Sequence, residues 1–187
     1  MTDKISPEHL SHAIGEVFGP DAVIFNEYPL RLDHCPREHP GTFFSLGPAG
    51  GLGWGLGAAL GAKLAAPDKF VIATLGDGAY MFANPTAGHW VAGKQDIPIL
   101  TILFNNSRYG AVRRSTLAMF KDGAAGESDG RFLADLDPAP PYDLLAAAQG
   151  ARAERVERPA DLPAALERAK EAVLEGRQAL LNVITPY

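Results

Sequence analysis

The sequence contains little cysteine and comparatively few basic residues. Cys35 is the single cysteine among 187 residues, which excludes an internal disulfide and is typical of a protein from the reducing cytoplasm. The 17 Lys and Arg residues are outnumbered by 22 Asp and Glu residues, for a formal net charge of −5. Non-specific binding to nucleic acid needs a basic face that displaces counterions. We therefore expect a cytoplasmic protein that does not bind nucleic acid.

The sequence also lacks a long uninterrupted apolar run. Residues 1–5 show no cationic segment followed by an apolar one, so no secretory signal is expected. The longest glycine-rich apolar tract, residues 46–66, contains seven glycines and is interrupted by Lys63. A membrane-spanning helix needs about 20 predominantly apolar residues. The tract is better explained by a buried helix and the loop that leads into it, and we expect no membrane contact.

Short apolar segments typical of buried strands alternate with segments typical of helices. Strands are expected at residues 22–25, 70–75, 98–104, 152–156 and 179–184, and helices at residues 6–18, 51–64, 80–92, 109–120, 142–149 and 161–175. Residues 27–48 and 121–141 are expected to be irregular. Uniformly apolar strands separated by helices predict a parallel sheet covered on both faces. The expected fold class is therefore α/β, one doubly wound domain over residues 1–187.

Unusual residues follow the second expected strand, in Gly76-Asp77-Gly78-Ala79. Ligands of such sheets bind beyond the carboxyl ends of the strands, near helix N-termini. Glycines there let the backbone approach a phosphate closely. A lone aspartate at the same place would repel that phosphate, unless a cation lies between them.

The third expected strand supplies residues that complete such a cation site. It is followed by Asn105-Asn106-Ser107-Arg108-Tyr109-Gly110, and Asn106 lies 29 positions after Asp77 (106 − 77). This separation is one crossover helix plus one strand, which predicts that the two residues lie on neighbouring strand ends. A carboxylate, an amide oxygen and a backbone carbonyl from the turn are hard oxygen ligands. With two diphosphate oxygens and a water they would form the octahedron that Mg²⁺ prefers.

Together these motifs resemble the signature of thiamine diphosphate enzymes. The signature residues are Gly76-Asp77-Gly78 and Asn105-Asn106, and a further feature lies upstream in Pro48-Ala49-Gly50-Gly51-Leu52-Gly53-Trp54. The sequence from Asn106 to Arg113 is most similar to the branch of benzoylformate decarboxylase and acetolactate synthase, and closer to the decarboxylases. The resemblance extends from about residue 6 to residue 186 and implies the fold of the C-terminal, diphosphate-binding domain of that family.

The resemblance implies a metal site and a cofactor site. Mg²⁺ would be bound by Asp77, by the side chain of Asn106 and by the backbone oxygen of Arg108. The expected cofactor-binding residues are Gly50, Leu52, Gly76, Gly78, Ala79, Asn106 and Tyr109. Groups at Gly78 and Ala79 would hold the diphosphate. The carbonyl of Gly50 would accept the aminopyrimidine amino group, and Leu52 would be the apolar support that bends the cofactor.

The resemblance also implies that half of the active site lies elsewhere. In this family an activating glutamate comes from a pyrimidine-binding domain, usually on a partner subunit, so we expect no catalytic residue within this chain. The expected function is a component of a 2-oxo acid decarboxylase or of an acetolactate synthase-like carboligase, acting on a small 2-oxo acid. It would work in a homo- or hetero-oligomer, either as a subunit of a split enzyme or as a fragment, and be inactive alone. The apolar, glycine-rich residues 50–56 are expected to form an associating surface.

The sequence departs from the family after Asn26-Glu27. Relatives often carry small hydroxyl residues there that help to hold the diphosphate, whereas this chain has Tyr28-Pro29-Leu30. Val112, Ser115 and Met119 fall where groups facing the substrate are plausible, although such contacts vary within the family.

Simpler interpretations remain open for several features. Gly76-Asp77-Gly78 alone would be a turn with a capping aspartate. Residues 53–58 contain a weak Gly-x-Gly-x-x-Ala dinucleotide fingerprint without a strand before it. His34, Cys35 and His39 form a possible but less favoured transition-metal cluster, and His89 is expected to be structural. The alternative function is a non-catalytic interaction or assembly module that retains the fold.

Overall fold

The structure is a computed structural model that describes residues 4–127 and 134–186, and its centre is one sheet of six parallel strands. The strand order is β2-β1-β3-β4-β6-β5. The strands are β1 (Val23–Glu27), β2 (Phe43–Ser45), β3 (Val71–Gly76), β4 (Leu100–Asn105), β5 (Arg152–Val156) and β6 (Ala179–Ile184). The five expected strands are confirmed. The expectation that residues 27–48 are wholly irregular is wrong, because the edge strand β2, too short to show a periodic pattern, pairs with β1.

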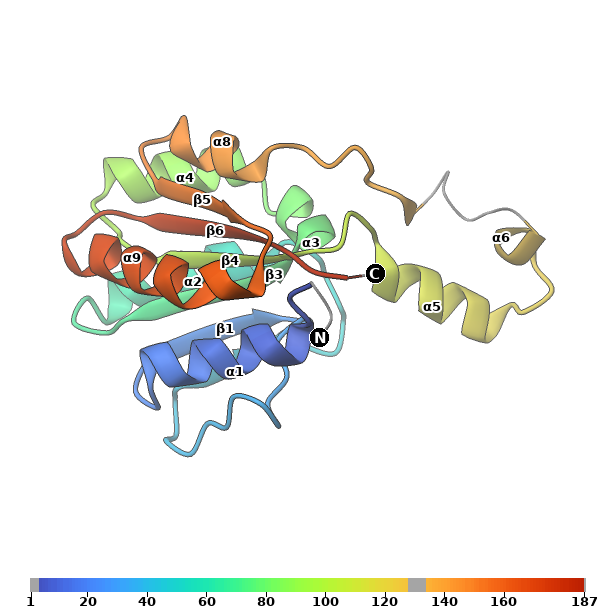
Figure 1. Ribbon diagram of the computed structural model, residues 1–187, viewed down its shortest axis with the longest axis horizontal. Helices are drawn as coiled ribbons and strands as arrows, with labels where there is room; N and C mark the ends of the chain where they lie inside the picture. The colour runs from blue at the N-terminus through green and yellow to red at the C-terminus, as the bar shows by residue number, and fades with distance from the viewer. Residues whose placement is uncertain (1–3, 128–133, 187) are drawn as a thin grey trace.

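Helices cover both faces of the sheet, as Figure 1 shows. They are α1 (Pro7–Phe18), α2 (Trp54–Ala65), α3 (Asp77–Phe82), α4 (Pro85–Lys94), α5 (Gly110–Met119), α6 (Ala124–Glu127), α8 (Tyr142–Ala147) and α9 (Leu162–Leu174), with a 3₁₀ turn at Pro159–Asp161. Helices α1 and α9 pack on one face of the sheet, and α2, α4 and α8 on the other. The predicted doubly wound α/β domain is confirmed.

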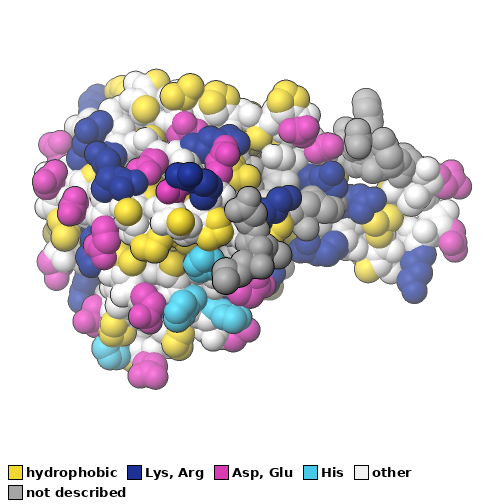
Figure 2. All heavy atoms as spheres, viewed as in Figure 1, with side chains coloured by type: hydrophobic (Ala, Val, Ile, Leu, Met, Phe, Trp, Pro, Cys, Tyr) yellow, Lys and Arg dark blue, Asp and Glu magenta, His cyan; other side chains and the backbone are white. Residues whose placement is uncertain are grey.

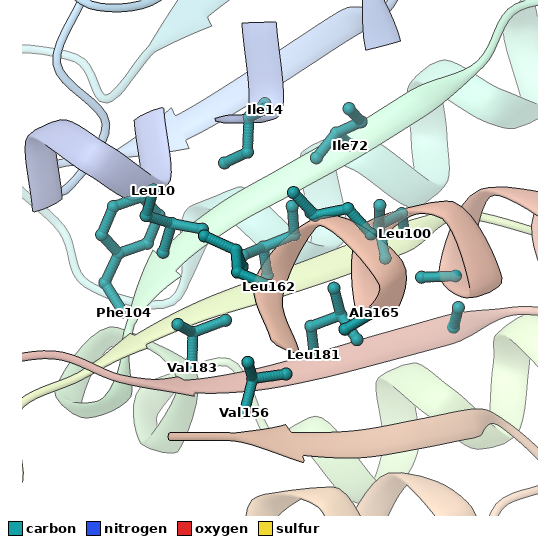
Figure 3. Packing of buried hydrophobic residues seen from close by; sticks show 14 of the residues in the cluster. Leu10, Ile14, Ile72, Leu100, Phe104, Val156, Leu162, Ala165, Leu181 and Val183 are labelled. Atoms are coloured by element: carbon teal, nitrogen blue, oxygen red, sulfur yellow. The ribbon is translucent and has the colours of Figure 1, made fainter. Parts of the chain in front are cut away.

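Each face has its own hydrophobic cluster. On the first face, side chains of α1 and α9 meet those of the central strands, as Figure 3 shows for Leu10, Ile14, Leu162, Ala165, Ile72, Leu100 and Phe104. On the second face, Leu56 of α2 and Tyr80 of α3 belong to a cluster that includes Leu103 of β4. Central strands buried on both faces explain why their sequences are continuously apolar rather than alternating.

The helix expected at residues 80–92 is wrong, because α3 and α4 are separate helices. Helix α3 begins at Asp77 and ends at Phe82, and α4 begins at Pro85. Between them Asn84 adopts a left-handed conformation with φ of 49°. A proline has no N–H and its ring clashes with the preceding turn, so it starts a helix more readily than it continues one.

Helix α2 also begins later than expected, at Trp54 rather than at Gly51. Gly53 has a φ of 94°, which interrupts helical geometry just before the helix. A Cβ on Gly53 would lie 2.7 Å from the carbonyl carbon of Phe82. The start of α2 therefore packs directly against the end of α3, and this contact requires glycine.

Helices α5 and α6 project away from the body of the molecule (Figure 1). None of their residues is buried. The stretch 121–141 was expected to be irregular, but it contains helix α6, and its Asp135 forms an isolated bridge with Arg108. Residues 128–133 of that stretch lie outside the described part. Within the described ranges, no helix combines the length and apolar character needed to cross a membrane.

Candidate active-site edge

Strands β1, β3 and β4 end side by side at the carboxyl edge of the sheet. In the parallel register Glu27 is paired with Leu75, and Gly76 with Phe104. Asp77 and the loop that follows Asn105 are therefore neighbours, as their spacing in the sequence predicts. This edge is where ligands of doubly wound sheets bind.

Asp77 is a buried carboxylate with an unsatisfied oxygen. Only 1% of the residue is exposed, and its Oδ2 has no hydrogen-bond partner among the described residues. Burial raises the pKa of Asp77 to about 6, although backbone N–H groups of the first turn of α3, and of Asn106 and Arg108, act in the opposite direction. The carboxylate thus lies beside the loop after β4. A cation at this place would stabilise the charged form and occupy the unpaired oxygen.

Two asparagines shape the loop after β4. Oδ1 of Asn105 accepts the backbone N–H of Ser107 at 3.0 Å, and Oδ1 of Asn106 accepts that of Arg108 at 3.1 Å. Ser107 adopts a left-handed conformation with φ of 55°. The amide oxygen of Asn106 keeps a second lone pair, because a carbonyl oxygen has two. The ligand role expected for Asn106 is compatible with this turn.

Backbone hydrogen bonds join the same loop to the segment that follows residue 133. The N–H of Tyr109 donates to the carbonyl of Ala134 at 2.8 Å, and the N–H of Leu136 donates to that of Ser107 at 2.7 Å. Nε of Arg108 lies 3.6 Å from Oδ1 of Asp135. These contacts fix the backbone at Arg108, whose carbonyl is the third expected metal ligand.

Tyr109 lies directly over the first turn of α3. A Cβ on Gly78 would be 2.5 Å from Cδ1 of Tyr109, so the close approach requires glycine. The ring of Tyr109 also makes an edge contact with Phe82, with 6.0 Å between the centroids. Gly78 and Ala79 are buried, whereas Gly76 is half-buried. The expected diphosphate residues are thus gathered around one turn.

Gly50 and Leu52 lie in the segment that leads into α2. Gly50 has a φ of 66°, and a Cβ there would be 3.3 Å from Oη of Tyr28. Leu52 is half-buried and packs against the second hydrophobic cluster. The expected associating surface at residues 50–56 is wrong in part, because Gly55 and Leu56 are buried in the fold itself.

The structure reveals functional candidates that the sequence analysis missed. Glu27 is fully buried at the end of β1 and bonds to the backbone before α2. Tyr142 is fully buried, and its Oη has no hydrogen-bond partner among the described residues. Burial is the main cause that raises the pKa of Tyr142, and the nearby charge of Asp77 raises it further. Asn182 of β6 accepts from Asn105 and donates to Asp143. Asn182 could have been found as a polar residue inside an otherwise apolar strand, whereas Glu27 follows Asn26 at the end of β1 and has no comparable signal.

His89 is structural, as expected. Its Nδ1 lies 2.8 Å from Oε1 of Gln178, and its Nε2 lies 2.8 Å from Oη of Tyr80. Because Nε2 of Gln178 donates to the carbonyls of His89 and Gln149, Oε1 of Gln178 is left to accept the Nδ1 proton. Nε2 of His89 then accepts from Tyr80, so this side chain is neutral. The chain of bonds ties α3 and α4 to the start of β6.

His34, Cys35 and His39 do not converge on one point. Cys35 is buried against Gly15, and Nδ1 of His39 lies 2.8 Å from a carboxylate oxygen of Asp21. No group of three or more His, Cys, Asp and Glu residues suited to a metal ion occurs in the described part of the chain. The expected Asp77 site has a different composition, since two of its ligands are an amide and a carbonyl oxygen.

Two surface hollows lie away from the candidate edge. Their volumes are about 500 and 550 Å³, and their walls come from segments near the amino-terminal ends of the strands, among them residues 92–98 and 176–178. Neither is lined by an expected site residue. The unpaired buried oxygens of Asp77 and Tyr142, by contrast, belong to the carboxyl edge of the sheet.

Known proteins are similar to this chain in sequence and in fold. The family described as "Thiamine pyrophosphate enzyme, C-terminal TPP binding domain" matches residues 30–183. A probable acetolactate synthase of Mycobacterium bovis is 35% identical over 165 residues, which cover 88% of this chain and 27% of that protein. An acetolactate synthase large subunit of Lactococcus lactis is 28% identical over 162 residues, covering 84% and 27%.

A solved structure with the same fold is the thiamine diphosphate-dependent 4-hydroxybenzoylformate decarboxylase of Rhodococcus jostii RHA1. It has a TM-score of 0.81 and 27% identity, over 100% of this chain and 34% of that one. The chain thus spans about a third or less of the length of these relatives. With most of its residues matched, this chain belongs to the thiamine pyrophosphate enzymes, as a member of the family of their C-terminal TPP-binding domain.

Proposed function

We propose that this chain binds the diphosphate end of thiamine diphosphate through Mg²⁺, as a component of a 2-oxo acid decarboxylase or an acetolactate synthase-like carboligase. The observation that carries the proposal is the buried Asp77, with Oδ2 unpaired, beside the loop of Asn106 and Arg108. An unpaired buried charge is costly, so it is retained where a cation completes it. The family membership supports the choice of cofactor.

The donor set fits Mg²⁺. Asp77 offers a carboxylate oxygen, Asn106 an amide oxygen and Arg108 a backbone carbonyl, all hard ligands of the kind that Mg²⁺ binds. Mg²⁺ usually keeps further positions for phosphate oxygens and water. In this proposal Asp77 neutralises part of the metal charge, and the fixed loop after β4 holds the two neutral ligands in place.

The glycines at this edge would let the cofactor approach the backbone. Gly76 and Gly78 flank Asp77, and a Cβ on Gly76 would meet nothing within 4 Å, whereas the space beside Gly78 is filled by the ring of Tyr109. Tyr109 closes one side of this turn. At the other end of the cofactor, the carbonyl of Gly50 would accept the aminopyrimidine amino group, and Leu52 would support the bent conformation from the core side.

When bound, thiamine diphosphate supplies an acidic thiazolium carbon and an electron sink, the chemistry that bond cleavage or formation beside a 2-oxo acid carbonyl requires. The residues of this chain orient that group and exclude water from its diphosphate end. Gly50 and Leu52, the residues assigned to the aminopyrimidine, have no side chain that could transfer a proton to it. We therefore propose that the activating glutamate belongs to a pyrimidine-binding domain outside residues 1–187.

An exposed apolar surface supports a docking partner. Val112 is 54% exposed, Met119 74% and Phe120 60%, all on or beside the projecting α5. Figure 2 shows Lys and Arg side chains gathered on the visible face of that projection. A monomer rarely keeps such apolar side chains in water along one element. We propose that they pack against the pyrimidine-binding domain in a homo- or hetero-oligomer.

Thermal unfolding with and without ligands tests the cofactor proposal. Thiamine diphosphate together with Mg²⁺ should raise the melting temperature, whereas either alone should have little effect. A ligand at 100 times its dissociation constant stabilises by about 2.7 kcal/mol, which for a domain of this size is roughly 5 to 10 °C. Equal shifts with and without metal would contradict the shared metal site.

The variant Asp77→Asn gives the matched test. It should abolish the shift caused by the two ligands, while the free protein is at least as stable as the wild type, because burial disfavours the charged form of Asp77 more than its backbone hydrogen bonds favour it. Asp68→Asn is the control, since Asp68 is exposed and follows α2 at the opposite edge of the sheet. An Asp77→Asn variant that responds to the ligands like the control would refute the proposed role of Asp77.

A further inference from the structure

Glu27 makes two short hydrogen bonds to the backbone at the start of α2. Its Oε1 accepts the N–H of Gly53 at 2.6 Å, and its Oε2 accepts the N–H of Gly55 at 2.7 Å. The side chain is fully buried at the end of β1. A carboxylate that accepts amide N–H groups forms charge-assisted hydrogen bonds, which are about twice as strong as neutral ones. Glu27 thereby supplies the cap that the N-cap residue Gly53 lacks.

The segment that Glu27 holds is enclosed on its other sides. A Cβ on Gly53 would meet the backbone of Phe82 at 2.7 Å, and a Cβ on Gly55 would meet Cδ2 of Leu75 at 2.9 Å. The start of α2 is therefore fixed by α3 and β3 through contact and by β1 through Glu27. The residues just before it, Gly50 to Leu52, are not bound in a strand or a helix. Their position depends on where α2 begins, together with the packing of Leu52 on the second hydrophobic cluster and the turn bond from Gly50 to Gly47.

The carboxylate of Glu27 is enclosed by the fold. Each oxygen accepts a backbone N–H and none of the residue is exposed, so this carboxylate is not available to hydrogen-bond a pyrimidine ring. It also occupies the N–H groups that an external anion would otherwise take at the start of α2. Its role is to fix a neighbouring segment rather than to contact the cofactor.

We infer that Glu27 is a positioning residue for the aminopyrimidine end of the cofactor, acting through the segment of Gly50 and Leu52. This inference rests on the proposed function, which assigns that segment to the aminopyrimidine. Removing the charge leaves one or both backbone N–H groups without a strong acceptor, so the segment gains freedom. Binding of the cofactor must then order this segment, and the conformational entropy lost in that ordering lowers the affinity for the cofactor.

Two ligands separate this role from a general effect on folding. Thiamine diphosphate engages both ends of the proposed site, whereas inorganic pyrophosphate with Mg²⁺ engages only the end at Asp77. The variant Glu27→Gln keeps the size of the side chain but replaces one acceptor oxygen by a donor. The control Glu16→Gln makes the same change at an exposed position of α1.

Isothermal titration of the full chain in saturating Mg²⁺ gives the decisive comparison. A hydrogen bond to a charged group contributes about 1.5 to 3 kcal/mol, so Glu27→Gln should weaken thiamine diphosphate binding by at least about tenfold. Its affinity for pyrophosphate should stay within about twofold of that of the wild type, and Glu16→Gln should match the wild type with both ligands. Unchanged affinity for both ligands, or an equal loss for both, would overturn the inference.

Amide hydrogen exchange provides a readout that does not depend on the cofactor. The N–H groups of Gly53 and Gly55 should exchange faster in Glu27→Gln than in the wild type, while those of β4 are unchanged.

If Glu27→Gln does not fold, Glu27→Asp retains the charge but is one methylene too short for both bonds, and the same two titrations apply. Failure of both variants to fold would make Glu27 a folding residue and overturn the inference. A wild-type chain that binds pyrophosphate but not thiamine diphosphate would instead refute the proposed function itself, and with it this inference.

Discussion

Two buried carboxylates at the carboxyl edge of the sheet are in opposite situations. Glu27 has both oxygens occupied by backbone N–H groups, whereas Asp77 keeps Oδ2 without a partner among the described residues. A satisfied buried charge stabilises the local structure, and an unsatisfied one destabilises it until a ligand arrives. The contrast separates a residue that organises the edge from one that is available to bind.

Tyr28 is a residue with backbone strain at the same edge. It has a φ of 79°, an unfavourable value for a bulky side chain, and it is 53% exposed. The turn is imposed by Asn26, whose Oδ1 accepts the N–H of Leu30 at 3.1 Å and the hydroxyl of Thr74 at 3.0 Å.

We predict that Tyr28→Gly is more stable than Tyr28→Ala by about 1 kcal/mol, because glycine adopts a positive φ without the Cβ clash. Both variants remove the ring, so their difference isolates the backbone conformation. Urea unfolding at equilibrium measures it. A Tyr28→Ala variant as stable as Tyr28→Gly would mean that the turn relaxes and that Tyr28 stores no strain.

The elements around the site are joined by buried polar bonds rather than by apolar packing alone. Tyr80 of α3, His89 of α4 and Gln178 beside β6 form a continuous chain of hydrogen bonds. Because α3 begins at Asp77, this chain fixes the helix that carries the expected metal ligand. Burial lowers the pKa of His89, with the bond to Gln178 acting against it.

We predict that the His89 network loses stability in acid. Since the folded pKa lies below the ordinary 6.5, the unfolded chain binds the proton more readily. The contribution of His89 is therefore fully present above pH 6.5 and is lost as the pH falls through 6.5 toward the lower folded value. The loss is at most about 1.4 kcal/mol per pH unit.

Urea midpoints of the wild type and of His89→Gln between pH 8 and pH 5 test this prediction. The difference in stability between the two proteins should shrink as the pH falls. The raised pKa of Asp77 acts in the opposite direction below about pH 6, because folding then favours the protonated carboxyl, but both proteins contain Asp77 and the effect cancels. A difference that does not change with pH would show that His89 binds its proton equally in both states.

The boundaries of helices were less predictable than their existence. The strands β3 and β4 and the helices α1 and α9 follow from apolar periodicity and from capping residues such as Ser6, whose Oγ accepts the N–H of His9 at 3.1 Å. The break between α3 and α4 was missed although Pro85 marks it. Its neighbour Asn84 takes a left-handed conformation, and the residues just before it, Phe82 and Ala83, pack against Gly53 at the start of α2.

In the proposed function the molecule as a whole supplies one half of an active site. The chain spans about a third or less of the length of its relatives, and the proposed site residues are all assigned to the metal and the cofactor. We predict that the purified chain, in Mg²⁺ and thiamine diphosphate, shows negligible decarboxylation of 2-oxo acids such as pyruvate and benzoylformate. The reason is that the expected site contains no group that activates the pyrimidine. Carbon dioxide release in a coupled assay measures it.

Addition of a pyrimidine-binding domain from a related enzyme is the informative control. Turnover that appears only on mixing would support a shared site, and Met119→Lys on the exposed end of α5 should weaken it by disturbing the proposed contact surface. Steady turnover by the chain alone would mean that the architecture of the site is misjudged.

The sequence by itself determined the fold class, the family and the neighbouring positions of Asp77 and Asn106 at adjacent strand ends. These depend on local periodicity and on the spacing of strand ends, which a linear pattern carries directly. Only the tertiary structure decided which polar groups are satisfied. Glu27 and Asp77 are both acidic residues at strand ends, and the glycines beside Asp77 do not indicate which of the two carboxylates has all its oxygens hydrogen-bonded. Their difference arises because the start of α2 returns to β1 from 26 residues further along the chain and offers its N–H groups to one carboxylate alone.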